Sequence, residues 1–430
     1  MSLSIQTVQN YTAILREELI PAMGCTEPIA IAYAAAILGK TLGGHPSSIR
    51  LLLSGNIIKN VKSVIVPATG GMHGIKAAVA AGIVASCPER RLEVLEGITE
   101  ADHPRIAAYC ESLSMELLEM ETDKPFDLDI VGTLEGITAR VKITDRHTNV
   151  ILVERNGENL TDTYLCSEHH EVLTVDHTTL NVKDIVEFAE TVPLDELESL
   201  LSRQIELNMA IAEEGIRGDW GASIGKILLS HAPNDVRVRA RAYAAAGSDA
   251  RMSGCEMPVC IISGSGNQGM TASVPVAVYA GHLGSDRETL LRALIVADLI
   301  TIHQKTGIGC LSAYCGAISA GCGAACGICY LHGGRFYEIA HTLVNSIAVL
   351  SGTICDGAKP SCAAKIAMAV DAGIMGYEMT VAKKQFYGGD GIVTKGVENT
   401  IRNVGRLARD GMSETDREII KIMLGSDAPN

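Results

Sequence analysis

The sequence predicts an α+β protein that is mainly α. It comprises a mixed N-terminal part over residues 1–180, with a small antiparallel sheet, and a larger helical part over residues 181–430. Polar and apolar residues alternate only within residues 126–154, which favours strands there, whereas helical spacing prevails from about residue 181 onward. Aromatic residues make up 4% of the chain and 43 residues are glycine. The core must therefore consist of small aliphatic side chains, which suit closely packed helices.

In the N-terminal part, helices and short strands are expected in turn. Helical spacing runs over residues 5–20, and the Ala-rich runs at 29–38 and at about 70–86 indicate buried helices. Residues 48–53 and 63–66 are predicted to be short strands.

The small sheet rests on three alternating runs, Asp127–Val131, Ile137–Ile143 and Val150–Val153. Gly, Asp and Asn residues lie between them and favour tight turns. We predict antiparallel pairing of the three strands.

Helical patterns dominate the rest of the chain. The predicted helices are 183–214, 286–305, 335–350, 361–374 and 413–424. Gly-rich junctions are expected at 264–269, 307–309, 321–334 and 388–391.

One uncharged stretch, residues 308–331, is long enough to span a bilayer. It is mostly Gly, Ala, Ser and Cys, and it lacks the large apolar side chains that drive insertion. We therefore predict a buried helix here.

The composition limits the classes of partner and compartment. The formal charge is −14 with no block of like charges, which argues against nucleic-acid and anionic-membrane partners, because both need a basic surface. Residues 1–18 lack the apolar core of a signal peptide, so we expect a cytoplasmic protein. Its 13 cysteines should then be free, buried or metal-bound. The Gly- and Ala-rich helices are compatible with a homodimer.

Seven of the thirteen cysteines lie between residues 310 and 362. A metal site needs such clustering, but cysteine is also a small apolar residue suited to helix packing. Cys322, Cys326 and Cys329 have the spacing C-x3-C-x2-C, which radical enzymes use for a cluster. On a helix they share one face, so they can equally form a core stripe, and we expect packing for this triplet.

A second candidate ligand set joins Cys315 to the loop that begins at Cys355 and ends at Cys362. Gly357 and Pro360 favour a turn, so both loop thiols can face one point. A helix is predicted to begin just after this loop, and its N-terminal dipole favours thiolate.

At this point the residues do not decide between a zinc ion and an iron–sulfur cluster. Structural zinc usually has four ligands in paired C-x2–4-C knuckles, whereas three thiolates with no evident fourth suit a [4Fe–4S] cluster with one open iron. Cys166 with His169 and His170 also lacks a nearby fourth ligand for zinc.

The segment from Cys315 to Cys362 resembles the iron–sulfur L-serine dehydratase alpha-chain family. Gly264-Ser265-Gly266-Asn267-Gln268-Gly269-Met270, followed by Val274-Pro275, is similar to the substrate loop of that family. This resemblance spans roughly residues 180–425.

The whole chain more closely resembles the L-cysteine desulfidase (UPF0597-type) branch. The motifs are Gly24-Cys25-Thr26-Glu27-Pro28, Ser54-Gly55-Asn56 and Pro67-Ala68-Thr69-Gly70-Gly71. Classical serine dehydratases do not share this N-terminal part. The chain departs from them in its shorter cysteine loop and in a C-terminus, residues 427–430, without the cysteine that caps the fourth iron in some of them.

The resemblance implies a lyase that holds a [4Fe–4S] cluster on Cys315, Cys355 and Cys362 and uses no pyridoxal phosphate. The implied reaction is β-elimination of L-cysteine to hydrogen sulfide, ammonia and pyruvate. Such a reaction needs a Lewis acid for the leaving group, a base for the α-proton and donors for the carboxylate.

Cys25 is our candidate for the base, because a loop thiol just before a helix is expected to have a lowered pKa. Small and amide-bearing residues in the two Ser-Gly-Asn loops are candidates for binding the substrate carboxylate. They are Ser54, Asn56, Ser265, Asn267, Gln268 and Thr271. Lys305 and Lys359 could also contact substrate, although a solvated charge is the commoner role.

Three alternatives stay open. L-Serine could be the substrate in place of L-cysteine, since one atom on Cβ separates them. The chain could also be a non-catalytic cluster-binding sensor, or a helical structural protein whose cysteines only pack.

Overall fold

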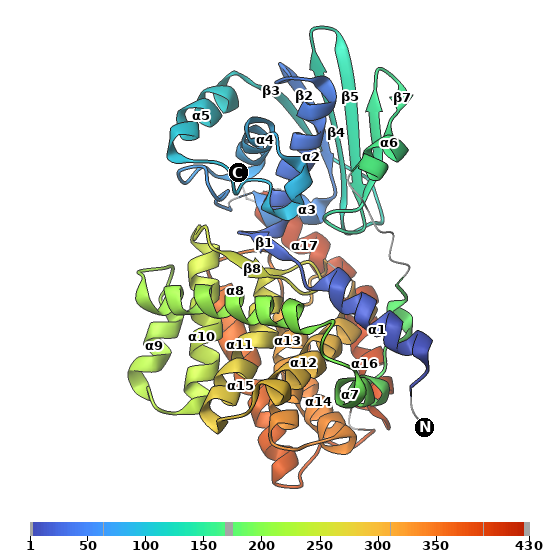
Figure 1. Ribbon diagram of the computed structural model, residues 1–430, viewed down its shortest axis with the longest axis vertical. Coiled ribbons are helices and arrows are strands. Elements are labelled where there is room, and N and C mark those ends of the chain that lie inside the picture. Colours follow the sequence, from blue (N-terminus) through green and yellow to red (C-terminus); the bar gives the residue numbers. More distant parts are fainter. Residues whose placement is uncertain (1–2, 63, 168–174, 310, 390, 425–430) are drawn as a thin grey trace.

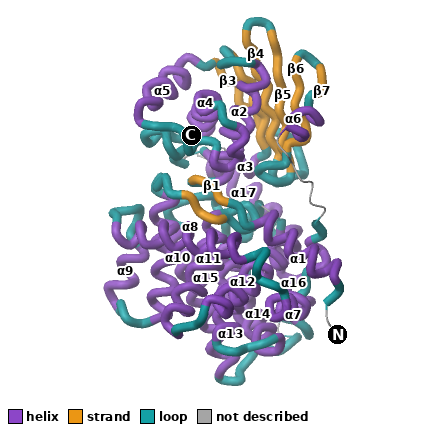
Figure 2. The backbone as a smooth tube through the Cα atoms, viewed as in Figure 1, coloured by secondary structure: helices purple, strands orange, loops and turns teal. Residues whose placement is uncertain are grey.

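The computed structural model describes residues 3–62, 64–167, 175–309, 311–389 and 391–424. The chain forms two lobes, one built around a sheet and one built of helices, and the predicted α+β, mainly α class is confirmed (Figures 1 and 2). We call them the sheet lobe and the helical lobe. Among the described residues, no helix is long and apolar enough to cross a membrane.

The sheet lobe has six strands in the order β3-β2-β4-β5-β6-β7. They are β2 (Ser48–Leu53), β3 (Ser114–Glu119), β4 (Asp127–Leu134), β5 (Ile137–Thr144), β6 (Val150–Arg155) and β7 (Glu158–Asn159). The three predicted strands from β4 to β6 pair antiparallel as expected. The sheet as a whole is mixed, because β2 pairs parallel with β3, a strand that the pattern did not reveal.

Helices cover the sheet and link it to the rest of the molecule. The helices of this lobe are α2 (Thr26–Leu42), α3 (Gly55–Val61), α4 (Gly74–Ala85), α5 (His103–Ser112) and α6 (Thr161–Ser167). Helix α2 is buried along almost its whole length and packs on β4 and β5. The strand expected near residues 63–66 is not formed by the described residues there, since Ile65 makes only an isolated bridge to His73.

The helical lobe consists of α7 to α16 together with the first helix of the chain. Its members are α1 (Ile5–Glu18), α7 (Val182–Thr191), α8 (Glu198–Arg217), α9 (Ile224–His231), α10 (Val236–Met252), α11 (Gly266–Leu283), α12 (Arg287–Ile308), α13 (Gly316–Leu331), α14 (Phe336–Leu350), α15 (Cys362–Val381) and α16 (Val397–Arg406). The helix α17 (Ser413–Leu424) returns to the sheet lobe and packs on α3.

Three expectations about this lobe need correction. The helix predicted at 183–214 is two helices, α7 and α8, separated around Pro193. The junctions expected at 264–269 and 321–334 are largely helical, as the start of α11 and most of α13. Glycine here serves close packing: a Cβ on Gly323 would lie 2.5 Å from the carbonyl oxygen of Ala297 in α12. The predicted buried helix is α13.

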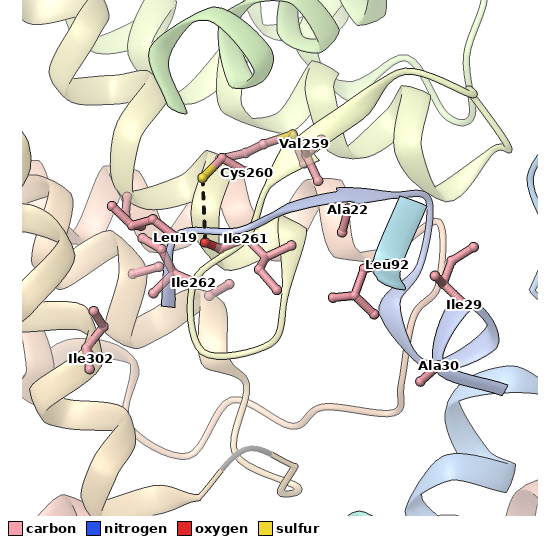
Figure 3. Close-up of a cluster of buried hydrophobic side chains, with 14 of the residues drawn as sticks. Leu19, Ala22, Ile29, Ala30, Leu92, Val259, Cys260, Ile261, Ile262 and Ile302 are labelled. Carbon is pink, nitrogen blue, oxygen red and sulfur yellow. Dashed lines mark hydrogen bonds between the residues drawn. The ribbon is translucent and has the colours of Figure 1, made fainter. Parts of the chain in front are cut away.

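Two short strands join the lobes. β1 (Pro21–Met23) pairs antiparallel with β8 (Pro258–Cys260). Apolar side chains from both lobes pack around this pair, among them Ala22, Ile29 and Ile261 (Figure 3). This core holds the start of α2 against the start of α11.

Candidate functional site

A cavity of about 100 Å³ lies between the lobes. Its walls are formed by the first turns of four helices, α2, α11, α13 and α15, together with α3 and the end of α10. Helix N-termini present unpaired backbone N–H groups and a partial positive charge, so this cavity favours thiolates and carboxylates.

The three cysteines singled out in the sequence line this one cavity. Cys315 is the N-cap of α13, and Cys362 is the first residue of α15. Gly321 and Gly373 let these two helices approach so closely that a Cβ on Gly321 would lie 2.5 Å from a carbonyl oxygen of α15. The cysteines are therefore positioned by helix packing as well as by the loop.

Cys355 is held next to Cys315 by backbone pairing. Tyr314 and Ile354 form an isolated antiparallel bridge, in which the N–H of Cys355 donates to the carbonyl of Ala313 over 2.6 Å. The hydrogen bond from the Cys315 thiol, together with the charge of Lys59, lowers the pKa of Cys355 to about 6. The pKa of Cys315 is in turn raised, first by its hydrogen bond to Cys355 and then by burial.

Cys362 receives a backbone hydrogen bond. The N–H of Lys359 points at its sulfur over 3.4 Å. Burial raises the pKa of Cys362, and this backbone donor acts in the opposite direction.

The spacing of the three sulfur atoms bears on the choice between one ion and a cluster. Ligands of a single zinc ion converge at about 2.3 Å from the metal. Among the described residues, the one set of His, Cys, Asp and Glu groups that converges in this way is Glu17, Glu18 and His177, and the three cysteines are not such a set. Cys315 and Cys355 lie within hydrogen-bond distance of each other, and three cysteine thiols on one cavity are the ligand type that iron–sulfur clusters use.

The rival triplet lies elsewhere. Cys322, Cys326 and Cys329 are buried in the packing of α13, and none of them lines the cavity. The Cys326 thiol points at the carbonyl of Ile339 over 3.8 Å. The side chains of Cys166, His169 and His170, and residues 427–430, lie outside the described part of the chain.

Cys25 lines the cavity in contact with a buried carboxylate. Its thiol donates to Glu27 over 3.2 Å, and Asn60 donates to the same carboxylate over 2.9 Å. Burial alone would raise the pKa of Glu27, but its donors and the nearby His147 lower it to about 2.

The expectation of a low pKa for Cys25 is corrected by this geometry. Burial raises the pKa of Cys25 well above its usual value, and the charge of Glu27 raises it further. Burial is thus the first cause, and the acidic neighbour two residues along the chain is the second. At rest the pair is therefore a thiol and a carboxylate.

The predicted carboxylate-binding residues divide into two groups. Asn56, Ser265, Asn267 and Gln268 line the cavity. The side-chain oxygens of Asn56 and Gln268 are buried there without a hydrogen-bond partner.

Ser54 and Thr271 do not line the cavity. Ser54 donates to the carbonyl of Pro125 over 2.8 Å, and Thr271 donates to the carbonyl of Asn267 over 2.6 Å. Both hydroxyls therefore serve local structure.

Several cavity residues were not singled out from the sequence. They are Glu27, Lys59, Asn60, Arg251 and Tyr314. Lys305, for which a solvated charge was the commoner expectation, is 4% exposed and lines the cavity. The sequence signal that could have indicated the cationic ones is a Lys or Arg within a helical run of small or apolar side chains, as in the Ala-rich α10.

Lys59 connects the cavity to the last helix. Its side chain is 1% exposed, and its ammonium group lies 2.5 Å from Asp416 of α17. The last helix thus supplies the counter-charge for a cavity residue.

Comparison with known proteins gives the same family on two grounds. Residues 89–421 match the family model described as "Serine dehydratase alpha chain". Over 97% of this chain and 96% of the relative, it is 54% identical to a UPF0597 protein of Desulfitobacterium hafniense. It is 45% identical to UPF0597 proteins of Treponema denticola, over 99% of this chain and 100% of the relative, and of Finegoldia magna, over 97% and 100%.

Proposed function

Because the chain belongs to the serine dehydratase alpha-chain family, through its UPF0597 branch, we propose that it is an iron–sulfur-dependent lyase that cleaves L-cysteine to hydrogen sulfide, ammonia and pyruvate. The observation that carries the proposal is the convergence of Cys315, Cys355 and Cys362 with the Cys25–Glu27 pair on one cavity. The region that matches the family model contains Cys315, Cys355 and Cys362. The alignment with the UPF0597 relatives covers nearly the whole chain and so also spans Cys25 and Glu27.

The donor set fits a [4Fe–4S] cluster. Cys315 and Cys362 lie at helix N-termini, Cys355 lies in the loop before α15 on the same cavity, and the hydrogen bond from Cys315 lowers the pKa of Cys355. A cluster held by Cys315, Cys355 and Cys362 would have only three protein ligands and would supply a Lewis acid for the leaving sulfur.

The Cys25–Glu27 pair supplies the base. We assign the sulfur of Cys25 as acceptor of the α-proton, while its own proton passes along the 3.2 Å hydrogen bond to Glu27. This coupled transfer needs no free thiolate, which the raised pKa of Cys25 disfavours. The Cys25–Glu27 pair holds one proton before this step and two after it, so the proton that leaves Cα is accounted for.

The products follow from the bond that breaks. Loss of the α-proton and of the Cβ–S bond gives sulfide and 2-aminoacrylate. Aminoacrylate tautomerises to the imine, which water hydrolyses to pyruvate and ammonia. No external oxidant or reductant is required.

The test is anaerobic reconstitution of the full chain, followed by iron counting and by assays of sulfide and pyruvate with L-cysteine. We expect stoichiometric sulfide and pyruvate, and a slower rate with L-cysteine deuterated at Cα. Cys25→Ser should retain the iron content and lose at least about 100-fold in kcat. Iron binding without turnover of any β-substituted amino acid would reject the lyase in favour of a sensor.

L-Serine is the second candidate substrate, because the matched family model is that of serine dehydratase. The same assay with L-serine measures pyruvate without sulfide. A higher kcat/KM for L-serine than for L-cysteine would reassign the substrate and leave the site intact.

A further inference from the structure

We propose that Arg251, at the end of α10, is the residue that binds the α-carboxylate of the substrate and so restricts the site to free α-amino acids. The inference rests on the proposed function for the identity of the reaction. The binding of the carboxylate can be tested without the reaction.

Arg251 is a buried cation that lacks an anionic partner. The residue is 4% exposed and lines the cavity. Within the described part of the chain, a terminal nitrogen of Arg251 donates to the side-chain oxygen of Asn267 over 3.1 Å, and its Nε has no partner. Among the described residues, no Asp or Glu forms an ion pair with it. Burying an unpaired charge costs several kcal/mol, so an anion is expected to bind there.

The local structure holds the guanidinium in place. It lies across Gly266, where a Cβ would come within 2.6 Å of Nε. Glycine at this position, between Ser265 and Asn267, is therefore needed to admit the arginine into the first turn of α11. The asparagine then fixes one end of the guanidinium, and Nε is buried beside this glycine without a partner.

The chemistry of the surrounding wall matches a carboxylate. The guanidinium binds a carboxylate through two parallel hydrogen bonds, and the N-terminus of α11 adds a partial positive charge. Gln268 lies in the same turn with a buried, unpaired side-chain oxygen, which can accept from the ammonium group of an amino acid. The charge of Arg251 also lowers the pKa of Cys25, so the arginine is close to the proposed base.

A matched arginine on the same helix serves as a control. Arg241 of α10 pairs with Asp371 over 3.2 Å and does not line the cavity. Replacing it by glutamine removes the same charge from the same helix without changing the cavity.

The experiment is calorimetric titration of the anaerobically reconstituted protein with L-2-aminobutyrate, which has the size of cysteine but no leaving group. The matched ligand is L-2-aminobutanamide, which lacks the carboxylate. We expect the acid to bind and the amide to bind roughly 100-fold more weakly. Arg251→Gln should weaken binding of the acid by a similar factor, Arg251→Lys by less, and Arg241→Gln not at all.

Unfolding of the ligand-free variants separates binding from folding. Arg251→Gln removes an uncompensated buried charge, so its melting temperature should equal or exceed that of the parent. Equal affinity of acid and amide, unchanged affinity in Arg251→Gln, or a lowered melting temperature in that variant would each overturn the proposal. Binding that depends on Arg251, together with no sulfide from L-cysteine, would reject the proposed function and leave this inference standing.

Discussion

Replacing Glu27 by Gln tests the buried carboxylate of the site. Its pKa is lowered to about 2, against about 4.3 for an ordinary glutamate, and each pKa unit corresponds to about 1.4 kcal/mol. The fold therefore stabilises the charged form by roughly 3 kcal/mol. Because the folded pKa is lowered, this contribution is complete above about pH 5, where the unfolded chain is also ionised, and is lost as the pH falls toward 2.

The assay is urea unfolding of the parent and Glu27→Gln at pH 7. We expect a loss of roughly 3 kcal/mol in the free energy of unfolding. The control is Glu89→Gln, which removes an exposed carboxylate that pairs with Lys40 and should cost less than about 1 kcal/mol. Equal losses in the two variants would refute the reasoning.

The same variant has a second readout at Cys25. Burial raises the pKa of this thiol most, and the charge of Glu27 raises it further. Glu27→Gln should therefore lower the pKa of Cys25, and the thiol should react faster with iodoacetamide at pH 8, as measured on its peptide by mass spectrometry. A slower reaction would contradict the assigned contact.

Three further variants, the first with a control, probe the loop from Cys355 to Cys362 and the last helix. Cys362→Ala should lose iron after anaerobic reconstitution, whereas Cys326→Ala should retain it; equal iron contents would contradict the assigned ligand set. Gly357→Ala should cost about 1–2 kcal/mol on urea unfolding, because φ is +91° at this residue, and it should also lower the retained iron. Asp416→Asn leaves Lys59 buried without its counter-charge and should cost about 3–5 kcal/mol. It should also make the last helix sensitive to protease, and unchanged resistance would argue against the pairing.

The helices and the central strands could be predicted because their signals are local. The alternation in β4 to β6 and the Ala-rich burial of α2 follow from residues adjacent in sequence. β3 could not be predicted, because most of its residues are partly or fully exposed and its one partner, β2, lies some 65 residues earlier. Glycines in α13 suggested a junction, and their packing role appears only once α12 and α15 are in place.

The residues of the candidate site could likewise be predicted only where their signals are local in sequence. The Gly/Pro loop between Cys355 and Cys362 is a local signal, so the thiols could be proposed from sequence. Arg251 could not, and Lys305 could be named only as a possible contact, since a charge becomes a cavity residue only through the packing of distant helices. For Cys25, the helix start was predicted, but burial and the charge of Glu27 reverse the inferred direction of its pKa.

The first helix has a consequence for how the protein forms during synthesis. Asn10 of α1 donates to the carbonyl of Asp176, 166 residues later, and β1 pairs with β8 beyond residue 257. A chain emerging from the ribosome therefore carries β1 without its partner strand until more than half of the protein has been made. The cavity closes later still, when the segment with Cys355 and Cys362 has emerged. If the proposed cluster is bound, its insertion must follow the synthesis of this segment, and a chain that stalls before residue 355 exposes an unfinished interface between the lobes.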